Sequence, residues 1–186
     1  MELRKLTDKQ IRIIYQERIR RDFSPEEIKP LSRIRKAMAE GHYACYGAFE
    51  GEQITAYAFL VINHECAMID YLAVREDLRG KGTGSRFLQL MMTGLMQPFH
   101  CVLLESEDPD FATEEAEANT MRNRLRFYLR NGLIETGVVS TVWYVHYRIL
   151  VLPVGEIPSA ESVKEIYSGI YRMLLPRMVY QKMVRL

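Results

Sequence analysis

The sequence has few of the features that would place a protein in a membrane or outside the cell. No apolar run approaches about 18 residues, so no transmembrane helix is expected. The first six residues alternate like a strand and lack the apolar region of a signal peptide. The net charge is only +1, which gives no general attraction to nucleic acid or to a membrane surface. These absences predict a cytoplasmic protein with neither nucleic acid nor membrane as a partner.

Residues that commonly bind metals are scarce and scattered. The three cysteines, Cys45, Cys66 and Cys101, have no metal-site spacing, and each lies in an apolar, strand-like segment. The four histidines also show no ligand spacing. We therefore expect buried, reduced thiols and no metal site.

Strand-like and helical patterns alternate along the chain, whose length suits one domain. With 48% hydrophobic residues, a substantial core can form. Strands are expected over 1–6, 43–49, 53–63, 67–74, 101–105, 134–139 and 143–152. Helices are expected from Thr7-Asp8, with Asp8 as N-cap, from Ser24, over 31–40, from about 83 to Met96, over 119–131 and from Ser159. This order predicts an α/β (α+β) fold, with a mixed sheet of about seven strands flanked by helices on both faces.

The most informative segment is a basic, glycine-rich turn between an expected strand and an expected helix. The first N–H groups of a helix have no internal partner, and the helix dipole is positive there. Gly80, Gly82 and Gly84 let a phosphate approach the backbone, and Arg79 and Lys81 add positive charge. The segment therefore predicts a binding site for a phosphorylated ligand.

Three kinds of phosphate-binding loop can be compared with this turn. A P-loop requires lysine followed by Ser or Thr, but Lys81 is followed by Gly82. The dinucleotide fingerprint fails because Gly84 comes one residue too soon. Residues 79–84 match the pattern [Gln/Arg]-x-x-Gly-x-[Gly/Ala] at every fixed position. In this respect the turn resembles the acetyl-CoA pyrophosphate loop of the GNAT N-acetyltransferases.

A second segment supports this resemblance. Phe127-Tyr128 is followed by Gly132-Leu133, which is similar to the GNAT helix that ends in Phe-Tyr-x-x-x-Gly-[Phe/Leu]. The resemblance implies that Tyr128 is the general acid that reprotonates the coenzyme A thiolate. The alternative interpretation is that Phe127 and Tyr128 are amphipathic helix residues packed in the core.

The resemblance also implies the rest of the cofactor site. In the GNAT fold, acetyl-CoA lies in a V-shaped cleft, where the strand before the glycine turn bulges and splays from the next strand. Backbone groups of Leu72, Ala73 and Val74 would pair with the pantetheine arm as an added strand would. The N–H of Ala73 or Val74 would also stabilise the developing oxyanion. The pyrophosphate would be bound by Arg79, Gly80, Lys81, Gly82, Thr83, Gly84 and Ser85.

The general base is less well defined by the sequence. One branch of the family has a glutamate where this chain has Met68. Asp70, two residues on and on the same face of the strand, is one replacement. Glu105, at the end of the next strand, is the other, because apolar neighbours can raise the pKa of a carboxyl group into the range of a base. Either carboxylate could instead be a solvated strand end or half of a structural ion pair.

An acidic segment begins at Glu105. Seven of the thirteen residues from 105 to 117 are acidic and none is basic. Such a segment is usually a solvated loop. Beside an acceptor site it could instead act as an electrostatic funnel for a cationic amine. This interpretation predicts a preference for a polyamine, an aminoglycoside-like compound or a basic peptide.

The last part of the chain lies beyond the resemblance. We expect a GNAT domain over residues 1–153 and an amphipathic helical extension over 154–186, with Ser159 as N-cap. The apolar positions of the extension suit packing on the domain or on a second copy, which would make a homodimer. A helix lying on a membrane is the other interpretation.

Taken with the resemblance, these features describe an N-acetyltransferase that uses acetyl-CoA as cosubstrate. It would move the acetyl group to a primary amine of a small molecule or peptide, by direct transfer in a ternary complex. The same fold transferring another acyl group is the closest variant. The alternative is a GNAT-like module that binds acyl-CoA as a sensor or interaction module without turnover.

Overall fold

A computed structural model describes residues 1–64, 66–95 and 98–186. The chain divides into two compact units. The first comprises Met1–Ile62 and Ile69–Pro98, and the second comprises Asn63–Met68 and Phe99–Leu186. Strand β4 (Cys66–Val74) therefore begins in the second unit and continues into the first.

The described strands follow the order β1-β2-β3-β4-β5-β7-β6-β8. The pairs β1/β2, β2/β3, β5/β7, β7/β6 and β6/β8 are antiparallel. The first unit holds β1 (Glu2–Lys5), β2 (Tyr43–Glu50), β3 (Gln53–Asn63) and most of β4. The second holds β5 (Cys101–Glu107), β6 (Ile134–Val142), β7 (Val145–Pro153) and β8 (Val184–Arg185). The prediction of an α/β fold with strands flanked by helices is confirmed.

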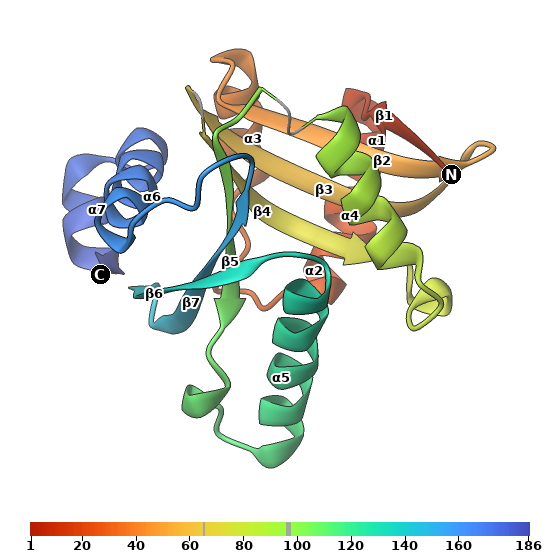
Figure 1. Cartoon of the computed structure of the whole chain (residues 1–186). Helices are drawn as coiled ribbons and strands as arrows, with labels where there is room; N and C mark the ends of the chain where they lie inside the picture. Colours follow the sequence, from red (N-terminus) through yellow and green to blue (C-terminus); the bar gives the residue numbers. More distant parts are fainter. Residues whose placement is uncertain (65, 96–97) are drawn as a thin grey trace. The chain divides into compact units, whose positions relative to one another are not determined.

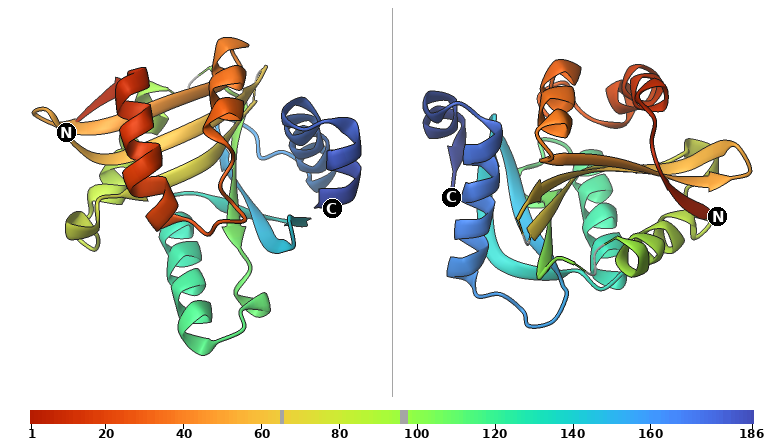
Figure 2. Two further views of the ribbon diagram at one scale, coloured as in Figure 1. Left: turned by 180° about the vertical axis from the view of Figure 1, so that it is seen from behind. Right: turned by 90° about the horizontal axis from the view of Figure 1, so that it is seen from above.

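Helices cover both faces of the strands in the first unit. On one face lie α1 (Asp8–Ile14) and α3 (Leu31–Ala39), and on the other lies α4 (Thr83–Gly94) (Figures 1 and 2). Helix α1 continues through a π-helical turn, Tyr15–Ile19, into the short α2 (Arg20–Asp22). Because both faces are covered, seven consecutive residues of β3 are buried instead of alternating with exposed ones.

Helices also flank both faces of the strands in the second unit. Helix α5 (Glu115–Arg130) and helix α6 (Ala160–Leu174) lie on opposite sides of β5, β7 and β6 (Figures 1 and 2). Helix α7 (Arg177–Met183) follows α6. Helix α6 buries the apolar stripe that the sequence predicts, and five of its residues are buried: Val163, Tyr167, Ser168, Ile170 and Tyr171.

Two local predictions near the N-terminus are wrong. No helix begins at Ser24: its N–H and hydroxyl donate to Glu27 and close a short turn, and the next helix begins only after Pro30. Proline disfavours helical backbone in the residue before it, which ends the turn there. The N-cap of α1 is Thr7 and not Asp8, because Thr7 and Gln10 cap each other in a capping box.

Three further features bear on the predictions. Strand β8, which the sequence pattern does not indicate, pairs with the end of β6. The predicted end of α4 near Met96 lies outside the described residues.

The three cysteines are free. The sulfur of Cys101 lies 3.7 Å from that of Cys66, and burial raises the pKa of the Cys101 thiol to about 12. Among the residues that the structure describes, no helix is long and apolar enough to span a membrane and no His, Cys, Asp and Glu cluster could hold a metal ion.

Candidate active site

The glycine-rich turn has the backbone geometry that its sequence predicts. After β4, a short 3-10 turn at Glu76–Leu78 leads to the glycines, and α4 begins at Thr83. Gly80 and Gly82 have φ angles of +72° and +80°, in the left-handed region that side chains with a Cβ rarely adopt. A Cβ built at either glycine meets nothing within 4 Å, so the backbone here is open to an approaching ligand.

The first turn of α4 presents open amides. The first hydrogen bond inside the helix runs from the Arg86 N–H to the Gly82 carbonyl, at 3.1 Å. The N–H groups of Thr83, Gly84 and Ser85 come before it and find no acceptor among the described residues. Three open amides at the positive end of a helix dipole form an anion site suited to a pyrophosphate.

Arg79 fixes the turn to the rest of the first unit. Its Nε donates to the Val74 carbonyl at 3.1 Å, and its Nη2 donates to Asp22 at 2.8 Å. The Asp22 carboxylate is almost fully buried and also accepts from the Tyr57 hydroxyl at 3.1 Å. Arg79 therefore positions the turn, while half of its side chain still faces solvent.

The other residues predicted to bind the cofactor lie on either side of these groups. Leu72, Ala73 and Val74 are half-buried at the end of β4, and Lys81 is exposed. Thr83, Gly84 and Ser85 are half-buried in the first turn of α4. All ten predicted residues belong to the first unit, which brings them together in the single connection between β4 and α4.

Asp70, the first candidate base, is a buried and fully engaged carboxylate. Its Oδ1 accepts from the Lys29 ammonium at 2.6 Å, and its Oδ2 accepts from the Tyr43 hydroxyl. Only 2% of its side chain is exposed. Burial, and next the charge of Asp70, raise the pKa of Tyr43 well above its usual value, so this phenol stays protonated. The next residue, Tyr71, hydrogen-bonds the Lys29 N–H at 2.8 Å.

Glu105, the second candidate base, lies on the face of β5 that α6 covers. Its Oε1 accepts hydrogen bonds from two tyrosines of α6, Tyr167 and, at 2.8 Å, Tyr171. The Tyr167 hydroxyl is also 2.7 Å from the Ser140 hydroxyl on β6. Burial, followed by the nearby Glu105 charge, raises the pKa of Tyr167 well above its usual value. Both tyrosines are buried, and Glu105 itself is half-buried.

Tyr128 lies in the last turn of α5 and is 6% exposed. The helix ends as predicted: the Leu133 N–H bonds the Tyr128 carbonyl, the Gly132 N–H bonds the Leu129 carbonyl, and Gly132 has a φ of +90°. Phe127 meets the Tyr128 ring edge to face, with centroids 5.4 Å apart. Helix α5, which carries Tyr128, lies on the side of β5 opposite to α6, whose tyrosines contact Glu105 (Figures 1 and 2).

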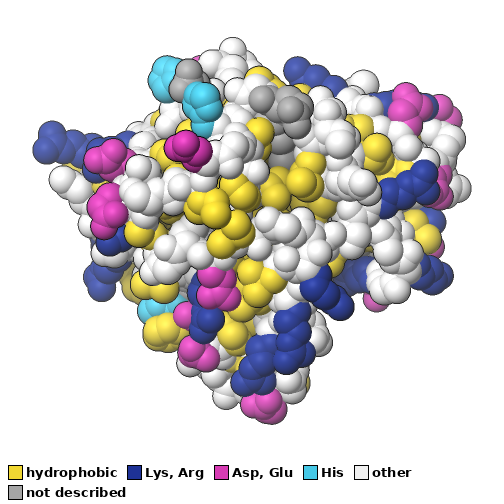
Figure 3. Space-filling model, in the orientation of Figure 1, with side chains coloured by type: hydrophobic (Ala, Val, Ile, Leu, Met, Phe, Trp, Pro, Cys, Tyr) yellow, Lys and Arg dark blue, Asp and Glu magenta, His cyan; other side chains and the backbone are white. Residues whose placement is uncertain are grey.

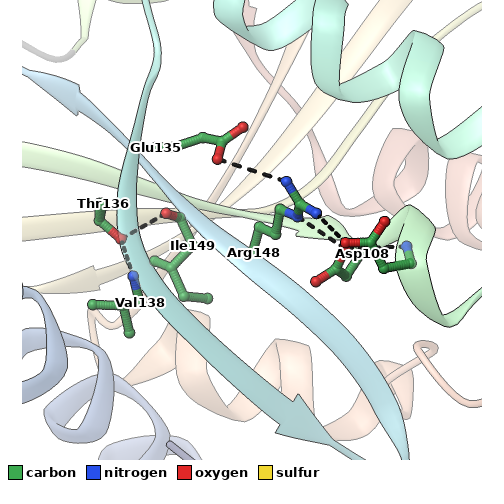
Figure 4. Close-up of polar contacts among 7 residues, drawn as sticks. Asp108, Glu135, Thr136, Val138, Arg148 and Ile149 are labelled. Atoms are coloured by element: carbon green, nitrogen blue, oxygen red, sulfur yellow. Dashed lines mark hydrogen bonds and ion pairs between the residues drawn. The ribbon is translucent and has the colours of Figure 1, made fainter.

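The acidic segment is largely paired with arginines that lie outside it. Arg148 on β7 binds Asp108 at 2.9 Å, Asp110 at 2.8 Å and Glu135 on β6 at 3.7 Å (Figure 4). On the neighbouring strand, a bulge is held by the Thr136 hydroxyl, which bonds the Ile149 carbonyl and the Val138 N–H (Figure 4). The Arg148 contacts reduce the negative field that the sequence alone indicates.

Helix α5 supplies the other arginines of this region. Arg124 binds Glu107, and Arg122 binds Glu115 at 2.8 Å. With Arg126 and Arg130, they make α5 a basic surface, and dark-blue side chains gather over this helix in Figure 3. The acidic segment therefore lies beside positive charge of similar size.

Sequence reasoning missed the partners of both carboxylates. Lys29 and Tyr43 are 41 and 27 residues from Asp70, and Tyr167 is 62 residues from Glu105. Tyr167 and Tyr171 stand one helical turn apart, a spacing visible in the sequence that indicates a shared face but not what that face meets.

Comparison with known proteins agrees with the fold. Residues 11–116, more than half of the chain, match the Acetyltransferase (GNAT) family. The chain belongs to this family and is an acetyl-CoA-dependent acyltransferase. No curated protein matches the chain.

Several solved structures share the fold. A protein of Bacteroides thetaiotaomicron described as a GNAT-family acetyltransferase has 21% identity and a TM-score of 0.68, over 89% of this chain and 93% of that one. An aminoglycoside 6′-N-acetyltransferase complexed with coenzyme A has 13% identity and a TM-score of 0.62, over 86% and 100%. The dodecameric spermidine N-acetyltransferase of Vibrio cholerae has 16% identity and a TM-score of 0.57, over 82% and 93%.

Proposed function

We propose that the protein transfers the acetyl group of acetyl-CoA to a primary amine of a small, cationic molecule, directly and within a ternary complex. The observation that carries the proposal is the connection between β4 and α4, with two left-handed glycines and three open amides at a helix start. That geometry suits the pyrophosphate of coenzyme A. The end of β4 would hold the pantetheine arm through the backbone of Leu72, Ala73 and Val74.

Tyr128 is the proposed general acid. When the C–S bond of the thioester breaks, the thiolate takes a proton from the Tyr128 hydroxyl. A free thiol has a pKa of about 8.5, so a phenol close to the sulfur is an adequate donor. The N–H of Ala73 or Val74 is the proposed donor to the carbonyl oxygen as negative charge develops on it.

Glu105 is the proposed general base, in preference to Asp70. The amine must lose a proton before it attacks, because an ammonium has no lone pair. Asp70 accepts from the Lys29 ammonium, and this positive charge cancels that of the carboxylate and opposes its taking a further proton. Glu105 accepts hydrogen bonds at Oε1 from two phenols, which are neutral. These two contacts do not cancel its negative charge.

Two observations support a cationic amine as the acceptor: the structural neighbours and, more weakly, the acidic segment. An enzyme named for spermidine and one named for an aminoglycoside, both compounds with several amino groups, share the fold of this chain. The acidic segment adds less than its sequence indicates, because Arg124 and Arg148 pair with Glu107, Asp108 and Asp110. We therefore expect recognition of a cationic amine through individual carboxylates rather than through a broad field.

The test is release of coenzyme A thiol from acetyl-CoA over a panel of polyamines, aminoglycosides, basic peptides and neutral amines. The panel is run with the parent, with Tyr128→Phe and with Tyr180→Phe as a matched control on α7. The expected result is turnover on one class, reduced at least about tenfold by Tyr128→Phe, with unchanged acetyl-CoA binding. Tyr180→Phe should leave the rate unchanged.

Other outcomes change the proposal in defined ways. Binding of coenzyme A without turnover on any amine, peptides included, would favour an acyl-CoA sensor. If coenzyme A does not raise the unfolding temperature, the proposed cofactor site is wrong, because a ligand that binds only the folded state must stabilise it.

A further inference from the structure

Helix α6 presents two phenols to the candidate base from a part of the chain beyond the matched residues 11–116. Tyr167 and Tyr171 stand one turn apart and are 0% and 2% exposed. Their rings lie 5.0 Å apart, and both hydroxyls reach Oε1 of Glu105. The Ser140 hydroxyl, 2.7 Å from that of Tyr167, adds a third polar group to the cluster.

Apolar packing also attaches the helix. Val163 and Ile170 are both fully buried, which already provides apolar contact for α6. Bringing phenols and a carboxylate out of water costs free energy unless every group is hydrogen-bonded. A helix that only had to pack would keep phenylalanine at these two positions. The hydroxyls are therefore best explained by what they do to Glu105.

Two hydrogen-bond donors on one carboxylate oxygen change both the ionisation and the orientation of a carboxyl group. They stabilise the ionised form and they fix its direction, so that the proton-accepting oxygen does not rotate. Tyr167 itself stays neutral, because burial raises the pKa of its phenol well above its usual value. Among the described residues, two further titratable side chains stand nearby in the strands: Glu107, two residues along β5 and paired with Arg124, and Tyr147, its partner in register on β7.

We propose that Tyr167 and Tyr171 are positioning residues of the acetyl-transfer site, and that they hold Glu105 ionised and oriented to deprotonate the acceptor amine. This proposal rests on the proposed function. Glu105 takes one proton from the ammonium, and the free amine attacks the thioester carbon. The C–S bond breaks, the nitrogen loses its second proton and the thiolate gains one. One proton is released to solvent per acetyl group transferred.

The test compares Tyr167→Phe, Tyr171→Phe and the double variant with Tyr180→Phe, a control that removes a phenol from α7. Two readouts are used. One is kcat and KM from pH 5 to pH 9 with the best amine of the panel. The other is a ¹³C-carboxyl NMR titration, in which Glu105→Gln assigns the Glu105 signal. The titration needs no turnover.

The expected result is a fall in kcat of about tenfold in the double variant, with the KM for acetyl-CoA unchanged. The acid limb of the rate profile and the NMR midpoint of Glu105 should both move upward, by about one pH unit. The single variants should show part of each shift, and Tyr180→Phe none.

Two results would overturn the proposal. If the phenylalanine variants are less stable but keep both the parent midpoint and the parent kcat, the phenols only support packing. If the midpoint moves but Glu105→Gln turns over normally, the cluster holds a carboxylate that takes no part in the reaction. Failure of the proposed function looks different, because the parent itself then turns over no amine.

Discussion

The two units hold their central carboxylates in different ways. In the first unit, Asp70 accepts from the ammonium of Lys29 and from the phenol of Tyr43. In the second, Glu105 accepts from the two phenols of Tyr167 and Tyr171. An ammonium cancels the charge of a carboxylate, whereas a phenol orients the carboxylate and leaves its charge in place. The first arrangement suits a structural tie, and the second suits a group that must take up a proton.

The sharpest test of this comparison replaces each carboxylate by its amide. We expect Glu105→Gln to lower kcat by about 100-fold, because a lost general base costs about that much. Asp70→Asn should change kcat by less than about threefold, since its oxygens hold a lysine and a tyrosine. Steady-state thiol release measures both. If Asp70→Asn is the slower variant, the roles of the two carboxylates are exchanged.

A second test removes the cation of the first unit. Lys29→Met leaves Asp70 buried beside a phenol alone, so we expect a loss of about 2–4 kcal/mol in the free energy of unfolding. Urea denaturation measures it. The double variant Lys29→Met with Asp70→Asn should recover part of the loss, because the stranded charge is gone. Equal stability of the single and double variants would contradict a structural ion pair.

A third test uses alkaline pH. The pKa of Tyr43 and that of Tyr167 are raised in the folded state. The stability that each phenol contributes is therefore fully present below about pH 10, and it is lost at higher pH because the unfolded chain ionises first. Each phenol should contribute about 1.4 kcal/mol of lost stability per pH unit above that value. Tyr43→Phe and Tyr167→Phe should each make the decline shallower. Urea midpoints between pH 9 and pH 11 measure the slope.

The smallest expected effect concerns the charge around the second unit's carboxylate. Arg148→Leu unpairs Asp108 and Asp110, so the KM for a cationic amine should fall by about two- to threefold at low salt. The KM for a neutral amine should not change, and high salt should remove the difference. An equal change for both amines would show that the charge of Arg148 is not the cause.

The features that the sequence predicts well depend on neighbouring residues. The glycine-rich turn could be located from its residues, because positive φ angles and an open helix start are properties of neighbouring positions. The end of α5 at Gly132 is local for the same reason. The family resemblance supplied the roles of Tyr128 and the turn, which local chemistry alone does not define.

The features that the sequence predicts poorly depend on contacts between residues far apart in the chain. The segment from Glu105 to Glu117 contains no basic residue, yet Arg148, 40 positions from Asp108, neutralises part of it. The expected funnel was therefore an overestimate of free negative charge. In the same way, nothing near Asp70 in the sequence indicates Lys29, and nothing near Glu105 indicates helix α6.

Strand β8 has a consequence for how the chain is made. Val184 and Arg185 pair with Val142 and Thr141 at the edge of the second unit. Domains form progressively as the chain leaves the ribosome, N-terminal parts first. All residues of the first unit have been synthesised by Pro98, but the second unit cannot close its sheet until residue 185 emerges. During synthesis, the part of the enzyme that offers the phosphate-binding turn thus precedes the part that carries Tyr128 and Glu105.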